Sequence, residues 1–164
     1  HWIMDINFWG VVHGVQAVLP GMRERGRGTI VNLSSLFGLM AVPNQSAYNA
    51  SKFAVRGYTE ALAGEERRHG IHVACVHPGG IRTAIARNAR FRPSQPSDPD
   101  RDRFVAYFDK VARTTAEQAA ATILEGVVAK KRRILIGTDA HLFDKIQRVF
   151  PTHYREVMRK LKLV

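Results

Sequence analysis

Three short apolar segments, each preceded by a helical pattern, set the strongest limit on how this chain can fold. Residues 29–33, 71–76 and 133–137 are rich in Val and Ile, as buried strands are. The alternation of helix and strand is typical of an α/β protein with a parallel sheet. With 164 residues, one domain is expected. The helical patterns cover residues 1–25, 46–68 and 116–129.

Glycine and proline mark the expected ends and breaks of the helices. Pro20 and Gly21 are expected to bend or interrupt the first helix. Gly70 is expected to end the helix over 46–68. Residues 142–163 are predicted to be helical, with a break near Pro151.

Composition excludes several classes of protein. Cys75 is the single cysteine, so no intrachain disulfide can form, which favours a reducing, cytoplasmic location. The net charge of +11 suggests nucleic acid, but no nucleic-acid motif accompanies it, and we predict no specific binding. The apolar runs are far shorter than the roughly 20 residues of a membrane span. No metal site is predicted.

Tyr48 and Lys52 stand one helical turn apart. On a helix their side chains share a face, with Cβ atoms about 5–6 Å apart. A free tyrosine has a pKa of about 10, and a neighbouring ammonium lowers that pKa because it stabilises the phenolate. The pair is therefore a candidate general acid/base for a carbonyl or hydroxyl oxygen. The alternative is a packed tyrosine beside a solvated lysine.

Two further segments stand at the carboxyl ends of predicted strands. Ser35 follows the strand over 29–33, and a Pro-Gly-Gly segment over 78–83 follows the next strand. Such positions face the crevice where ligands bind in open α/β sheets. The Ser35 hydroxyl could hold a substrate oxygen, while the glycine backbone and Thr83 could hold an amide-bearing ligand. Turn chemistry at a strand end is the alternative for both segments.

Together these motifs resemble the short-chain dehydrogenase/reductase family, of the type with a Ser-Tyr-Lys site. The resemblance runs over nearly the whole chain, from Asp5-Ile6-Asn7 through 28–35 and 48–52 to 78–83. It implies the C-terminal half of a doubly wound, Rossmann-like parallel sheet, with residues 1–164 as the C-terminal part of one NAD(P)-binding domain. It also implies hydride transfer between a nicotinamide, of NAD or NADP, and a small carbonyl or alcohol substrate.

The resemblance assigns a role to each matching residue. Tyr48 would exchange a proton with the substrate oxygen, and Ser35 would orient that oxygen. Lys52 would lower the tyrosine pKa and bind the nicotinamide ribose. Asn7 would hold a water that links Lys52 to solvent; a helix residue bonded to neighbouring backbone is the alternative. The cofactor-binding residues would be Tyr48, Lys52, Pro78, Gly79, Ile81 and Thr83.

The phosphate-binding pattern Gly-x-Gly-x-x-Gly occurs nowhere in the chain. Because the chain opens on His1 inside a helical pattern, we expect a fragment that by itself binds cofactor poorly and is inactive. The alternative is a truncated, non-catalytic dimerisation module. By the same resemblance, the helices bearing Asn7 and Tyr48 would form a homo-oligomer, a dimer or tetramer.

Two segments carry hypotheses of their own. Residues 84–103 are expected to form a long polar loop that binds the substrate and orders as a lid. Its arginines suggest an anionic substrate, against the alternative of a solvated loop. Basic and apolar residues alternate over 154–164, which suggests peripheral membrane attachment, against the alternative of a docked helix. The arginines are Arg82, Arg87, Arg90 and Arg92.

Overall fold

The computed structural model describes residues 1–90 and 100–161. An N-terminal helix is built from α1 (Trp2–Met4), a π-helical turn η1 (Asp5–Trp9) and α2 (Gly10–Glu24). Strand β1 and the 3-10 turn η2 lead into the long helix α3, and a second turn η3 ends at β2. The bounds are β1 (Gly28–Leu33), η2 (Leu36–Gly38), α3 (Ser46–Glu65), η3 (Glu66–His69) and β2 (Ile71–Pro78).

The second part of the chain alternates short strands with helices of varied length. It contains β3 (Ile81–Arg82), α4 (Ile85–Asn88), α5 (Arg101–Val111), β4 (Thr114–Thr115), α6 (Ala116–Val128), β5 (Arg133–Ile136), α7 (Thr138–Val149) and α8 (Tyr154–Lys160).

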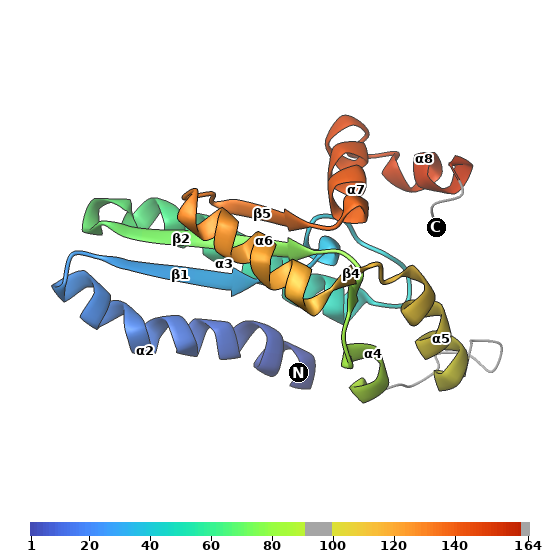
Figure 1. Cartoon of the computed structure of the whole chain (residues 1–164), viewed down its shortest axis with the longest axis horizontal. Coiled ribbons are helices and arrows are strands. Elements are labelled where there is room, and N and C mark those ends of the chain that lie inside the picture. The colour runs from blue at the N-terminus through green and yellow to red at the C-terminus, as the bar shows by residue number, and fades with distance from the viewer. Residues whose placement is uncertain (91–99, 162–164) are drawn as a thin grey trace.

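The main sheet has three parallel strands in the order β1-β2-β5. Gly28 pairs with Ile71 and Leu33 with Val76, while Cys75 pairs with Arg133 on the other side of β2. All three strands point their carboxyl ends toward the end of the molecule that holds α4, α5 and α7 (Figure 1). The prediction of an α/β fold with three parallel strands is confirmed.

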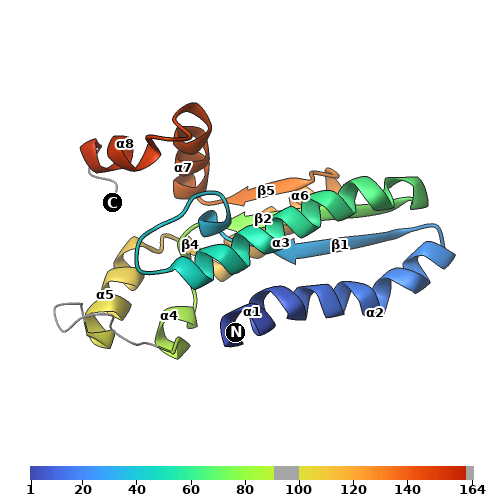
Figure 2. The same cartoon turned by 180° about the vertical axis from the view of Figure 1, so that it is seen from behind.

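Helices cover both faces of this sheet. Helix α6 lies in front of the strands in Figure 1, and α3 lies in front of them in the opposite view of Figure 2. Apolar residues of α2 and α3 pack on one face, among them Val15 and Leu62 against Ile30 and Val73. On the other face Ala119 of α6 packs against residues of β2 and β5, among them Val76 and Ile134. Burial on both faces explains why the strands read as near-continuous apolar runs.

A third apolar cluster lies at the carboxyl end of the sheet. Leu39 and Met40, in the segment after η2, pack against Ile146 of α7 and Met158 of α8. The C-terminal helices are therefore docked onto the segment that follows β1. Tyr154 reinforces this contact, because its hydroxyl donates to the Ala41 carbonyl at 3.1 Å.

The structure corrects several expected boundaries. Helix α2 continues through Pro20, so the predicted interruption was wrong. Pro20 is exposed, and its neighbours Leu19 and Met22 stay packed on the core. The predicted loop over 84–103 contains α4 and the start of α5; its middle part, 91–99, lies outside the described residues. The break near Pro151 is confirmed, and Gly70 ends η3 in the left-handed conformation.

Candidate active site

Ser35 lies where β1 ends and the chain turns into η2. It is buried, and its Oγ accepts the backbone N–H of Phe37 at 3.1 Å, which caps the turn. The carbonyl oxygen of Ser35 lies 3.2 Å from Nδ1 of His77, a fully buried residue near the end of β2. Neighbouring strand ends are thus tied together at Ser35, at the edge of the sheet where the sequence placed it.

Tyr48 lies in the first turn of α3 and reaches back to this strand end. Its side chain lies close enough to that of Ser35 for the serine hydroxyl to influence the phenol. The edge of its ring meets the Phe37 ring, with 6.3 Å between centroids. Burial raises the pKa of Tyr48 above its ordinary value of 10, and the neighbouring Ser35 hydroxyl offsets part of that shift. The phenol is therefore protonated at neutral pH.

Lys52 lies on the same face of α3, one turn beyond Tyr48. Its Nζ is 5.8 Å from the centroid of the Tyr48 ring and donates to the Leu33 carbonyl at 3.1 Å. Burial lowers the pKa of Lys52. The sequence predicted that this ammonium lowers the tyrosine pKa; in the folded chain, burial of the phenol raises that pKa instead.

Close contact between α3 and the end of β1 fixes this geometry. Ser34 is buried and its Oγ donates to the backbone carbonyl of Lys52 at 2.8 Å. A methyl group on Gly38 would lie 2.7 Å from that same carbonyl oxygen. The backbone of Lys52 is therefore packed directly on the segment that carries Ser35.

Asn7 lies in the π-helical turn η1 and joins the site through an unexpected residue. Its Nδ2 donates to Oγ of Ser51 at 3.1 Å, and Ser51 in turn donates to the Tyr48 carbonyl at 2.7 Å. Ser51 is fully buried. Sequence reasoning missed it, although a small polar residue beside Lys52 on a buried helix face was the available signal.

The backbone N–H groups of the Pro-Gly-Gly segment at the end of β2 are bonded to acceptors within the protein. The Gly79 N–H donates to the Ile136 carbonyl at 2.9 Å, and the Gly80 N–H donates to a carboxylate oxygen of Asp139 at 2.7 Å. Both amide donors are therefore engaged within the protein, and the ligand-binding role of the segment stays a prediction. Of the predicted binding residues, Ile81 lies in β3 and Thr83 follows it, its hydroxyl accepting the Ile85 N–H at 3.4 Å.

The arginines near the predicted substrate loop have partners within the protein. Nε of Arg82 donates to the Ala112 carbonyl at 3.4 Å, and Arg87 lies 3.9 Å from Asp109. Arg90 lies over the Trp2 ring, 4.2 Å from its centroid. These contacts favour a structural role over an anion-binding role; Arg92 lies outside the described residues.

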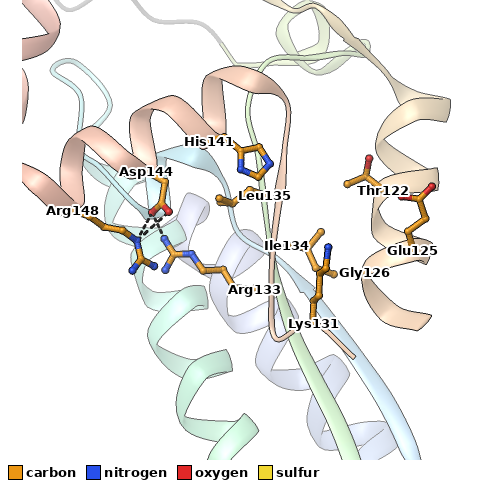
Figure 3. A pocket seen from close by; sticks show the side chains of 10 residues that line it. All are labelled: Thr122, Glu125, Gly126, Lys131, Arg133, Ile134, Leu135, His141, Asp144 and Arg148. Carbon is orange, nitrogen blue, oxygen red and sulfur yellow. Dashed lines mark hydrogen bonds and ion pairs between the residues drawn. The ribbon is translucent and has the colours of Figure 1, made fainter. Parts of the chain in front are cut away.

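A cavity of about 230 Å³ lies elsewhere, along β5 between α6 and α7 (Figure 3). Arg133 and Arg148 both bind the carboxylate of Asp144 there, which ties β5 to α7. None of the residues that line this cavity belongs to the Ser-Tyr-Lys site. We therefore place the candidate active site at the strand ends, not in this cavity.

His77 gives the folded state a specific dependence on pH. Burial lowers its pKa from 6.5 to about 4. Between pH 6.5 and 4 the unfolded chain therefore binds a proton at His77 that the folded chain does not bind. The contribution of neutral His77 to the free energy of unfolding is full above pH 6.5 and falls as the pH drops toward 4. The loss is of the order of 3 kcal/mol. Urea unfolding at pH 7 and pH 4.5 measures it, and H77N should lose less stability over that interval than the unchanged chain; equal losses would contradict this role.

In the described residues, no helix is long and apolar enough to cross a membrane. The apolar side of α8 is turned to the core, where Met158 is buried and Tyr154 and Val157 pack beside it. This packing favours the docked helix over the surface-attached helix as the interpretation of the tail.

The parallel sheet, the covering helices and the residues at the strand ends define a Rossmann-like α/β protein. The family model described as short chain dehydrogenase matches residues 1–93. The putative oxidoreductase SadH of Mycobacterium tuberculosis is 48% identical over 159 residues, which are 95% of this chain and 56% of that protein. The chain belongs to the short-chain dehydrogenase family, whose members are oxidoreductases with an NAD(P)-binding fold.

Solved structures agree with this assignment. A short chain dehydrogenase/reductase from Burkholderia phymatum in complex with NAD gives a TM-score of 0.76 at 28% identity, over 91% of this chain and 57% of that chain. A short chain dehydrogenase from Burkholderia cenocepacia in complex with NADP gives a TM-score of 0.70 at 22% identity, over 96% of this chain and 56% of that chain. This second likeness supports the fold. The chain thus spans about half the length of the relatives that it matches.

The comparisons correct the assignment to the C-terminal portion of the family. The resemblance extends over nearly the whole chain, as expected, with the first relative matching 95% of it, while the family model itself matches residues 1–93, the N-terminal part of the chain. The motifs behind the expectation all lie between Asp5 and Thr83, inside this matched part. The position of a motif within one chain does not locate that chain within a longer relative, and the C-terminal assignment was wrong.

Proposed function

We propose that this chain carries the catalytic and nicotinamide-binding residues of an oxidoreductase that interconverts a carbonyl and an alcohol. The observation that carries the proposal is the meeting of the Tyr48 and Ser35 side chains at the carboxyl end of β1, with Nζ of Lys52 5.8 Å from the centroid of the Tyr48 ring. Membership in the family supports it. The substrate class and these residue roles are our inference.

Each of the three side chains has a distinct task in this proposal. The protonated phenol of Tyr48 donates its proton to the carbonyl oxygen in reduction and takes it back in oxidation. Ser35 holds the same oxygen through its hydroxyl. The Lys52 ammonium uses one donor on the Leu33 carbonyl and has two more for ribose hydroxyls. A bound nicotinamide would supply or accept the hydride.

The residues present fit the nicotinamide end of such a cofactor. Leu33, beside Lys52, is half exposed, so the strand end is open to a ligand. Because the N–H groups of Gly79 and Gly80 already have acceptors in the protein, Ile81 and Thr83 would bind the nicotinamide carboxamide. Relatives bind NAD in one structure and NADP in another, and both remain candidates here. We also propose that the isolated chain binds the whole cofactor weakly, because its sequence has no glycine-rich phosphate pattern.

A non-catalytic association module remains the second candidate, and one observation favours it. Trp2, Ile6 and Trp9 are each about half exposed on the helix that carries Asn7, and Phe53 is 40% exposed on α3. Exposed aromatic residues of this size are typical of surfaces that bind another protein. The proposed partner is a second copy of the chain.

The deciding experiment uses the protein as its source produces it. NADH and NADPH are each mixed with a series of ketones and aldehydes, and loss of the reduced nicotinamide absorbance is followed. We expect carbonyl-dependent oxidation of one of the two cofactors. A dimer in sedimentation that neither binds nor oxidises either cofactor would overturn the catalytic proposal in favour of the association module.

A further inference from the structure

The carboxylate of Asp139 is enclosed by three glycines. Asp139 lies in the first turn of α7, and one of its oxygens accepts the Gly80 N–H at 2.7 Å. A methyl group on Gly79 or on Gly137 would overlap the carboxylate. Gly79 and Gly137 thus leave room for this carboxylate against the turn that follows β2, and Gly80 supplies the N–H that it accepts.

Backbone contacts hold the remaining groups of the same turn. The Gly79 N–H is bound by Ile136 of β5, and the Gly80 carbonyl accepts the N–H of Thr114 at 3.4 Å. Asp139 adds a charged acceptor, and such hydrogen bonds are stronger than those between neutral groups. The path of the chain into Ile81 is therefore set from β5, β4 and α7 together.

We propose that Asp139 is a positioning residue that sets the affinity of this protein for the nicotinamide end of its cofactor. The inference rests on the proposed function, in which Ile81 and Thr83 bind the carboxamide. By fixing Gly80, Asp139 places the backbone of Ile81 before any ligand arrives. Preorganisation of this kind raises affinity because less ordering remains to be done on binding.

The first test needs no cofactor. Hydrogen exchange of the Gly80 amide is measured by NMR in the unchanged chain, in Asp139→Ala, in Asp139→Asn, and in Glu156→Gln as an exposed control. Asp139→Ala should speed exchange by about tenfold or more, since it removes a charged acceptor. Asp139→Asn keeps an acceptor oxygen and should restore most of the protection. Unchanged exchange in Asp139→Ala would overturn the inference.

The second test uses the space around the carboxylate. Gly79→Ala alone should distort the turn, because its methyl group overlaps Asp139. In an Asp139→Ala background the three atoms nearest to that methyl group are gone, so Gly79→Ala should add little further loss. Thermal unfolding of the four proteins measures the coupling. Losses that simply add would contradict the enclosure of the carboxylate.

The third test measures ligand affinity with nicotinamide mononucleotide, which lacks the adenosine half of the cofactor. Asp139→Ala should weaken binding about tenfold or more, with Asp139→Asn close to the unchanged chain. Equal binding by Asp139→Ala and the unchanged chain would overturn the inference and leave the proposed function standing. No binding by the unchanged chain would overturn the proposed function, while exchange at Gly80 still decides the contact of Asp139 with the turn.

Discussion

Replacing Tyr48 with phenylalanine should lower kcat for carbonyl reduction by about 10²–10⁴-fold, the contribution of a positioned general acid. Phenylalanine preserves the ring that packs edge-on against Phe37 and removes only the hydroxyl that lies beside Ser35. Because Lys52 and the segment over 78–83 are untouched, the affinity for the nicotinamide cofactor should fall far less than kcat. Steady-state rates and a cofactor titration on the protein that carries this chain measure the two quantities separately.

The same helix supplies a matched control. Tyr58 lies on α3 and packs its ring edge against Phe8, with 6.1 Å between centroids, away from Ser35. Y58F should therefore leave kcat within about twofold, as expected for a substitution outside the reacting groups. A Y48F protein as active as Y58F would remove Tyr48 from the acid role.

The pKa of Tyr48 predicts different pH dependences for reduction and for oxidation, which pH–rate profiles in both directions measure. Burial raises that pKa, so the phenol is protonated throughout the neutral range. Reduction, which needs the proton donor, should be nearly independent of pH near neutrality. Oxidation needs the phenolate, and its rate should rise as the pH is raised.

Sequence reasoning located the parts of the fold and site that depend on local pattern. The three strands were found because burial on both faces makes them continuous apolar runs. Ser35 and Tyr48 were paired because a carboxyl strand end and the first turn of the next helix meet at one edge of a parallel sheet. The approach of the two side chains in the folded chain agrees with that geometry.

Contacts across long stretches of chain could not be predicted in the same way. Gly80 and Asp139 are 59 residues apart, and nothing local to either indicates the hydrogen bond between them. Asn7 and Ser51 are 44 apart and meet only because α3 packs beside η1. The direction of the Tyr48 pKa shift was missed for a related reason. The proximity of Lys52 is visible in the sequence, whereas the burial that raises the pKa is a property of the folded chain.

Replacing Gly38 with alanine should destabilise the fold by about 1–3 kcal/mol, the usual cost of forcing a methyl group into a packed site. The methyl carbon would lie 2.7 Å from the Lys52 carbonyl oxygen and 3.0 Å from its carbonyl carbon, and it would also overlap Oγ of Ser34. Two of these neighbours are backbone atoms of α3, which cannot rotate away. Relief requires α3 to move, and with it the bond between Ser34 and Lys52.

Gly57 offers the opposite case on the same helix, since a methyl group there would meet nothing within 4 Å. Alanine at that position should stabilise the protein by about 0.5–1 kcal/mol, because glycine is a poor helix former. Urea unfolding of G38A and G57A should therefore give free energies on opposite sides of the unchanged chain. If G38A were as stable as G57A, the close packing of Gly38 on the Lys52 backbone would not be what holds α3 against the Ser35 segment.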